Sequence, residues 1–262
     1  MIEPLLRELD LWHAENRRAT LWWRDDDACT DTPALRRLLG LARDYVVPVT
    51  IAAIPANSDD ALVAAVAGSE EATVVQHGYA HRNHARPGER SAELAVGRDV
   101  ASMQRELEAG RVRLAAMFGE RFVPILVPPW NRMTNELAPH LPRLGFTGLS
   151  RFGPRPSRNV VPNLPQVNTH VDPIAWRHER RFIGLASTAS RVVEHLAARR
   201  THACDAEEAT GVLTHHLAFG DDAWLGIRAL LDATARHPAV QWLSARAAFA
   251  APSPHAKAAR YA

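Results

Sequence analysis

Short β-rich runs alternate with helical stretches along the whole chain, and this alternation limits the folds that are open to it. Alternating strands and helices favour parallel strands joined by crossover helices. Seven or eight such units predict a single-domain α/β fold, a distorted (β/α) barrel of about seven strands. The expected strands are Ala19–Arg24, Val46–Ile54, Thr73–Gln76, Pro124–Val127, Phe146–Ser150, Leu164–Val171, Gly211–Thr214 and Val240–Leu243.

Helix-start residues lie between these runs. Thr32 followed by Pro33 is typical of an N-cap and a first-turn proline, and it predicts a helix to about Asp44. We expect one domain over residues 1–250 and a flexible tail over residues 251–262. Further helices are expected to start at Ser58, Ser91, Thr134, Thr188 and Asp221, the second of them ending near Phe118.

Composition narrows the function classes. Of the 262 residues, 47% are hydrophobic, which suffices for a sizeable core, and the net charge of +2 gives no case for a nucleic-acid partner. No segment approaches 18 uninterrupted apolar residues, and residues 1–18 carry charges throughout, so neither a membrane span nor a signal peptide is predicted. We therefore expect a cytoplasmic protein with Cys29 and Cys204 as reduced thiols. The oligomeric state stays open.

Residues with ligand or catalytic side chains follow four of the expected strands. They are the runs Asp25–Asp27, His77–His81, Pro128–Asn131 and Thr214–His216. Active sites of (β/α) barrels lie at the C-terminal ends of the strands. The recurrence therefore predicts that these side chains gather at one edge of the barrel.

The three consecutive aspartates and the histidine pair point to a metal, although each has a plainer interpretation. Adjacent carboxylates repel one another, and a metal ion, a neighbouring arginine or full solvation relieves the repulsion. The plainer interpretation of the aspartates is a solvated turn after a strand. His77 and His81 with one carboxylate form a common catalytic zinc shell. They would otherwise be exposed or core-capping histidines.

Four motifs together resemble the polysaccharide deacetylases, carbohydrate esterase family four, whose members share the NodB homology domain. The motifs are Asp26-Asp27, His77 to His81, Pro129-Trp130 and Leu213-Thr214-His215. They occur in the family's order and span residues 20 to 216. The resemblance implies a hydrolase with a carbohydrate substrate, which removes an N-acetyl group from a sugar or glycan by attack of metal-bound water.

The resemblance also implies a division of roles. Asp26 would be the general base and His215 the general acid, while Asp27, His77 and His81 would bind a divalent metal, usually zinc. A rival register would use Asp25 and Asp26 as base and ligand. In the preferred register Asp25 is an intervening residue, and its side chain points to the opposite side of the strand end.

Other residues are expected around the substrate. They are Arg24, Pro129, Trp130 and Asn131, with the backbone N–H of Trp130 as a candidate oxyanion donor. The family usually has an arginine that pairs with the base where this chain has Val127, and we hypothesise that Arg24 supplies that charge.

Asp172 and Trp176 match the family's Asp/Trp motif only loosely, so a turn aspartate and a core tryptophan stay open. His216 is expected to be structural, because it faces away from His215 on a strand.

Two other function classes stay open as well. They are a metal-dependent amidohydrolase acting on another C–N bond, and a non-catalytic carbohydrate-binding protein of the same fold.

Overall fold

A curled parallel sheet forms the centre of the protein, as seen in a computed structural model that describes residues 2–177 and 179–250. The strand order is β10-β1-β2-β3-β4-β5, with β11 also beside β1, and every pair in this sheet is parallel. This half-barrel confirms the predicted (β/α) class. Its strands are β1 (Ala19–Ala28), β2 (Val49–Ala53), β3 (Ala72–His77), β4 (Phe122–Val127), β5 (Gly148–Leu149), β10 (Thr210–Thr214) and β11 (Val240–Leu243).

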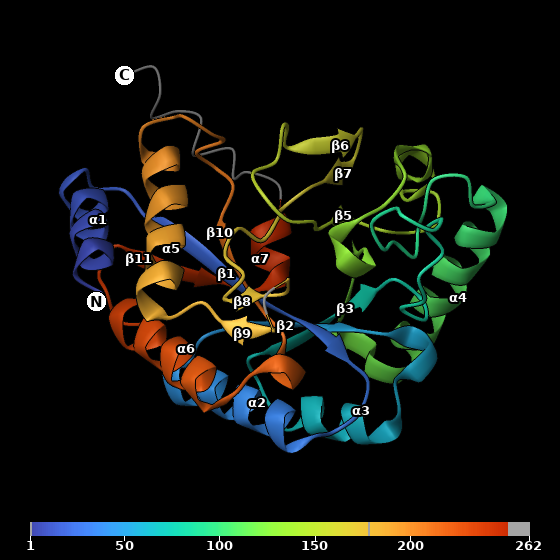
Figure 1. Cartoon of the computed structure of the whole chain (residues 1–262), viewed down its shortest axis with the longest axis horizontal. Helices are drawn as coiled ribbons and strands as arrows, with labels where there is room; N and C mark the ends of the chain where they lie inside the picture. The colour runs from blue at the N-terminus through green and yellow to red at the C-terminus, as the bar shows by residue number, and fades with distance from the viewer. Residues whose placement is uncertain (1, 178, 251–262) are drawn as a thin grey trace.

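Helices cover the outer side of the sheet. Figure 1 shows them in an arc that runs from α1 and α5 past α6, α2 and α3 to α4. The α-helices are α1 (Glu3–Ala14), α2 (Pro33–Tyr45), α3 (Asp60–Ala67), α4 (Val100–Phe118), α5 (Leu185–Arg200), α6 (Asp221–Thr234) and α7 (Ala245–Phe249). Short 3-10 helices are η1 (Pro55–Asn57), η2 (Gly119–Arg121), η3 (Pro129–Asn131), η4 (Asn135–His140) and η5 (His216–Ala218).

Strand β1 divides two parts of the core. Its residues alternate between the two faces of the sheet, so Leu21 and Trp23 pack with the outer helices while Trp22 faces the inside of the curl. Inside, the ring of Trp22 lies 5.9 Å from that of Phe249, and α7 thereby fills the inner face. Arg24 and Asp26 continue the inward-facing series of Trp22, and they lie at the C-terminal end of the strand.

The predicted strand Leu164–Val171 is only partly regular. Its first residues, β7 (Leu164–Pro165), form a hairpin with β6 (Asn159–Val161), and a second hairpin joins β8 (Ile174–Ala175) to β9 (Arg181–Phe182). Between the hairpins, single bridges link Gln166 to β5 and Val171 to β10. The segment therefore lies between the two edge strands of the curl without forming a continuous ladder with either.

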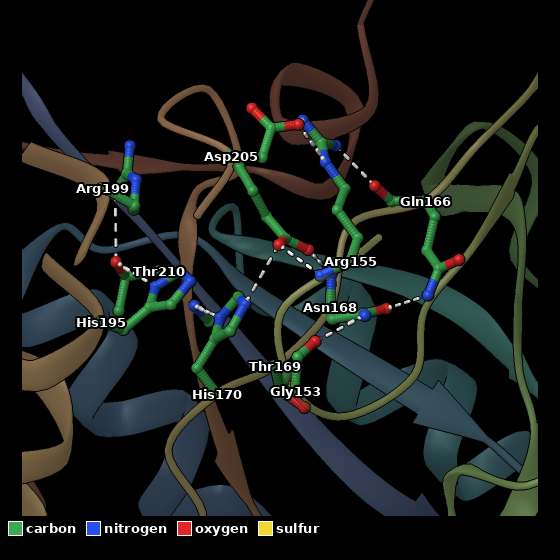
Figure 2. Close-up of polar contacts among 12 residues, drawn as sticks. Gly153, Arg155, Gln166, Asn168, Thr169, His170, His195, Arg199, Asp205 and Thr210 are labelled. Carbon is green, nitrogen blue, oxygen red and sulfur yellow. Dashed lines mark hydrogen bonds and ion pairs between the residues drawn. The ribbon is translucent and has the colours of Figure 1, made fainter. Parts of the chain in front are cut away.

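Side-chain hydrogen bonds supplement the few backbone bonds of this segment (Figure 2). The Asn168 side chain donates to the carbonyl of Gly153 at 2.6 Å and accepts from Gln166 at 2.9 Å. The buried Glu208 carboxylate accepts from the backbone N–H groups of Arg155 and Asn168, both at 2.9 Å. These bonds fix the irregular segment to the start of β10.

Several predicted helix boundaries were wrong. The helix expected from Ser91 is α4, which begins at Val100 behind an Asp99 N-cap, because residues 91–98 instead run beside the loop after β4. Thr188 lies inside the first turn of α5, and the helix expected from Ser58 is capped by Asp59. The Thr32 and Thr134 caps are confirmed, the second one on a 3-10 helix.

The helix α1 was not predicted at all. It covers the sheet beside α5 and buries Leu5, Leu9 and Trp12. Within the described residues, none of the helices has the length and apolar character needed to span a bilayer. The predicted tail over residues 251–262 lies outside the described residues, so that boundary stays a prediction.

Candidate metal centre and active site

Asp27, His77 and His81 meet at the C-terminal edge of the sheet. The Nε2 atoms of the two histidines lie 3.1 and 3.3 Å from the same carboxylate oxygen of Asp27. One ligand atom from each of the three residues falls within 4.8 Å of the others. The fold thus brings together three residues that span 54 positions of the sequence, from Asp27 to His81, and they form a group able to hold a metal ion.

The hydrogen bonding of His77 fits a metal ligand. Its Nδ1 lies 3.0 Å from the carbonyl oxygen of Val127, and a carbonyl only accepts, so Nδ1 carries the proton. In the neutral ring, the Nε2 lone pair then points at the Asp27 oxygen. Two acceptors facing each other at 3.1 Å require a cation or a proton between them. An orienting bond of this kind is typical of metal-binding histidines.

The charges around the pair favour a proton between these two atoms. Burial alone would raise the pKa of Asp27, but the hydrogen bond and charge of His77 lower it far below its usual value. Burial likewise opposes a charge on His77, yet Asp26 and Asp27 raise the pKa of that ring. Burial and the neighbouring His77 lower the pKa of His81. A proton on His77 would occupy the position that a metal would take, so a metal would compete with it.

Unusual backbone conformations gather at this edge. Of the ten non-glycine residues with positive φ among those described, four are predicted site residues, namely Asp27, His81, Trp130 and Asn131. Such conformations are disfavoured in L-residues and concentrate at functional sites. At Trp130 the turn brings the indole to 4.2 Å from the His81 ring, measured between centroids.

Glu93 holds the loop between the two histidines, and the sequence analysis missed it. Its buried carboxylate accepts from the backbone N–H groups of Tyr79 at 2.9 Å and Ala80 at 2.7 Å. A Cβ on Gly78, whose φ is +55°, would lie 1.9 Å from this carboxylate. Glu93 stands between small apolar residues in the sequence, and an isolated acid in such a segment is the signal that identifies it.

Arg24 braces Asp26 on the inner face of β1. The guanidinium contacts both carboxylate oxygens, with Nε 2.8 Å from Oδ1 and Nη2 2.9 Å from Oδ2, and both side chains are fully buried. Arg24 also donates to Ser150 and Asn131, each at 2.7 Å. The cation beside Asp26 thus comes from β1 itself, and β2 and β3 lie between it and Val127 on β4.

Asp25, the first aspartate of the run, faces the opposite side of the sheet from Asp26. Asp25 points to the outer side of β1, as the alternation predicted, and its carboxylate bonds to Thr214 and His216 of the β10 end. Asp25 is not in the Asp27 group, so the geometry favours the register with Asp26 as base and Asp27 as ligand. His216 also faces outward and is buried, but it begins η5 and is not on the strand where it was expected, because β10 ends at Thr214.

His215 lies against Trp176. The two rings meet edge to face with centroids 4.6 Å apart, and the Trp176 indole N–H donates to Asp172 at 2.7 Å. The charge of His215 acts on both Asp27 and Asp172, and burial raises the pKa of Asp172. Both residues that the sequence left open therefore adjoin His215. Trp176 is 41% exposed, so it is not the core tryptophan of the plainer interpretation.

The remaining predicted positions are also accounted for. Pro129 is buried and packs over Gly78, while Trp130 and Asn131 are partly exposed beside His81 and Arg24. Cys29 and Cys204 are free and partly buried, as expected.

A second group of donor residues does not fit a metal. His170, His195 and Glu208 lie close together, with the imidazole rings stacked at 3.4 Å (Figure 2). However, the backbone N–H of Gly211 donates to Nδ1 of His170 at 2.9 Å, so Nε2 of the neutral ring carries the proton. That atom points at Glu208, 3.4 Å away, and has no lone pair for a metal.

Comparisons with known proteins agree with this architecture. A polysaccharide deacetylase assigned in Mycobacterium smegmatis is 16% identical, with 87% of each chain covered and a TM-score of 0.64. The Bc1960 peptidoglycan N-acetylglucosamine deacetylase is 15% identical over 87% of each chain, with a TM-score of 0.56. A family 4 acetyl xylan esterase from Clostridium thermocellum, solved with cobalt, is 12% identical over 86% of this chain and 87% of its own, with a TM-score of 0.53.

No family model matches the sequence, and no curated protein matches it either. One solved structure of this fold is a family-four pseudoenzyme carrying a mutation that restores activity, so the fold alone does not establish catalysis. The solved structures show that the chain has the fold of the polysaccharide deacetylases and family-four carbohydrate esterases.

Proposed function

We propose that the protein is a metal-dependent hydrolase that removes the N-acetyl group from a sugar or glycan. The convergence of both histidine Nε2 atoms on one oxygen of Asp27, beside a carboxylate braced by Arg24, carries this proposal. Asp27, His77 and His81 are the proposed metal ligands, and zinc is the proposed metal because two imidazoles and a carboxylate suit it. The solved relatives named above include sugar deacetylases, which supports this substrate class.

Bound at this group, a divalent metal would lower the pKa of a coordinated water and polarise the amide carbonyl. The residues of the chain would move the protons. Asp26 accepts the proton of the attacking water as the new C–O bond forms. When the C–N bond breaks, its electron pair goes to nitrogen and His215 donates the proton that the departing amine needs. Acetate and the free amine are the products.

Other residues around the site would orient the substrate. The exposed Trp176 and the partly exposed Trp130 offer aromatic faces on which a sugar ring packs. The backbone N–H of Trp130 is the proposed donor to the developing oxyanion. Arg24 keeps Asp26 oriented and supplies the charge that a buried carboxylate needs. The cytoplasmic location stays a prediction from the sequence.

The test combines metal content with acetate release. The zinc-loaded protein should release acetate from N-acetylglucosamine oligosaccharides, lose that activity with a chelator and regain it with zinc. Asp27→Asn should abolish both zinc binding and acetate release, whereas Asp221→Asn, at a side chain that is 90% exposed, should change neither. Acetate release that survives complete metal removal would refute the proposed metal dependence. Zinc binding without acetate release from any N-acetylated sugar would favour another amide substrate or a non-catalytic protein.

A further inference from the structure

The Asp25 carboxylate holds the chain on both sides of His215. Its Oδ2 accepts from the Thr214 hydroxyl at 2.6 Å and from the His216 backbone N–H at 3.0 Å. Its Oδ1 lies 2.5 Å from Nδ1 of His216. One carboxylate therefore binds the residues immediately before and after the proposed general acid.

This carboxylate is well placed to resist movement. The Asp25 and His216 side chains are 0% and 1% exposed, so in their contact neither group has solvent as an alternative partner. Burial would lower the pKa of His216, but the Asp25 charge and hydrogen bond raise it. The Thr214 hydroxyl that donates to Asp25 also accepts from the Trp23 indole at 2.9 Å, which joins the contact to the outer core.

The His215 ring itself has little else to orient it. Its Nδ1 is buried and has no hydrogen-bond partner among the described residues. Asp172, the nearby carboxylate, instead accepts from the Trp176 indole and the Ile174 backbone N–H. An edge contact with Trp176 limits the ring on one side but does not fix its rotation. The direction of the imidazole therefore depends on the backbone at residues 214–216.

We propose that Asp25 is a positioning residue that holds the Thr214–His216 backbone and thereby sets the direction of His215 toward the leaving nitrogen. The inference rests on the proposed function of His215 as general acid. This positioning role differs from both sequence registers, which made Asp25 either a base or an intervening residue. Asp25 acts from the outer face of β1 without touching the substrate.

The proposal makes the effect of Asp25 depend on the leaving group. Breaking the C–N bond of an N-acetyl sugar requires a proton on the departing amine, whereas 4-nitrophenolate leaves an acetyl ester without one. A misplacement of about 1 Å at a proton-transfer group can cost about 100-fold in rate. Loss of the Asp25 hydrogen bonds to Thr214 and His216 should therefore lower kcat for the amide and leave the rate of ester hydrolysis almost unchanged.

The experiment compares Asp25→Ala, Asp25→Asn and wild type on N-acetylglucosamine oligosaccharides and on 4-nitrophenyl acetate. We expect Asp25→Ala to lower kcat for the amide by at least tenfold with little change in KM, and to alter ester hydrolysis less than twofold. Asp25→Asn keeps an oxygen that accepts from Thr214 and His216, so it should recover most of the amide rate. Visible spectra of the cobalt-substituted proteins should coincide, which shows an unchanged metal centre. Asp221→Ala is the matched surface control.

Equal losses on amide and ester, or no loss on either, would overturn the positioning proposal. If Asp25→Ala does not fold, Asp25→Ser takes its place, because its single short acceptor cannot reach both neighbours of His215. A wild-type protein that hydrolyses neither substrate would instead refute the proposed function, so the two failures are distinguishable.

Discussion

Consecutive residues at the end of β1 have different contacts because their side chains point to different sides of the sheet. Arg24 and Asp26 face the inside of the curl, Asp25 faces the helices, and Asp27 turns toward the histidines with a φ of 78°. Strand alternation explains the first three directions, and the irregular backbone at Asp27 explains the fourth. Three adjacent carboxylates are tolerable because each has a separate partner.

The first prediction concerns Arg24. Arg24→Ala leaves the Asp26 carboxylate buried without its counter-charge, and breaking a buried pair this way costs about 3–5 kcal/mol. We expect that loss in urea unfolding, together with a fall in kcat/KM at every pH tested. Arg24→Lys should be intermediate, because an ammonium lacks the two-pronged contact. A variant with full activity across pH would contradict the role assigned to Arg24. As a control, Arg37→Ala at an exposed ion pair should cost under about 1 kcal/mol.

At the scale of elements, the loops after the strands carry most of the site. The Glu93 carboxylate holds the loop after β3, which contains His81. The loop after β3 turns at Gly78 and wraps around Glu93, which brings His81 back toward His77. Glu93 comes from residues 91–98, the segment expected to begin a helix. A helix there would have removed Glu93 from this position, so the failed boundary marks a segment that supports the site.

The second prediction concerns this loop. Glu93→Gln places an amide N–H against a backbone N–H of Tyr79 or Ala80, so the loop should loosen and His81 should lose its position. Supporting residues of this kind typically change metal affinity by about 10–100-fold, and we expect zinc affinity to fall within that range. Competition with a chromogenic chelator measures it. Glu89→Gln, an exposed acid near the same loop, should leave the affinity unchanged. Equal affinities for Glu93→Gln and wild type would show that Glu93 does not position His81.

At the scale of the whole molecule, buried polar groups join the two ends of the curled sheet. The cluster around His170, His195 and Glu208 links α5, β10 and the irregular segment before Val171 (Figure 2). It supplements the isolated backbone bridges of that segment. The cluster lies at the start of β10, whereas the proposed metal ligands lie at the C-terminal edge, so the two can be perturbed separately.

The third prediction concerns acid stability. Burial lowers the pKa of His195 to about 2, so below about pH 6.5 the unfolded chain binds a proton that the folded protein does not. Stability should therefore fall as the pH drops, and this group alone should cost about 2 kcal/mol between pH 6.5 and 5. In urea unfolding across this range, His195→Asn should lose less stability than wild type by that amount. His202→Asn, at an exposed histidine, should keep the wild-type slope. Equal slopes for His195→Asn and wild type would contradict the prediction.

The sequence by itself determined the fold class, the positions of most strands along the chain and the polar residues at the strand ends. Hydrophobic periodicity and capping residues are local signals, and they place Asp26, Asp27, His77 and His215 at strand ends before any contact is known. Because parallel strands share one C-terminal edge, the common location of these residues also followed.

Only the tertiary structure decided which of these residues touch. It joined Asp27 to both histidines, paired Arg24 with Asp26, moved Glu93 beneath the histidine loop and turned Asp25 toward His216. It also ruled out metal binding by His170, through a backbone N–H on another strand. Except for the pair of Arg24 and Asp26, two residues apart on one strand, these contacts join residues distant in sequence and depend on turn geometry and strand register, so no local pattern in the chain encodes them.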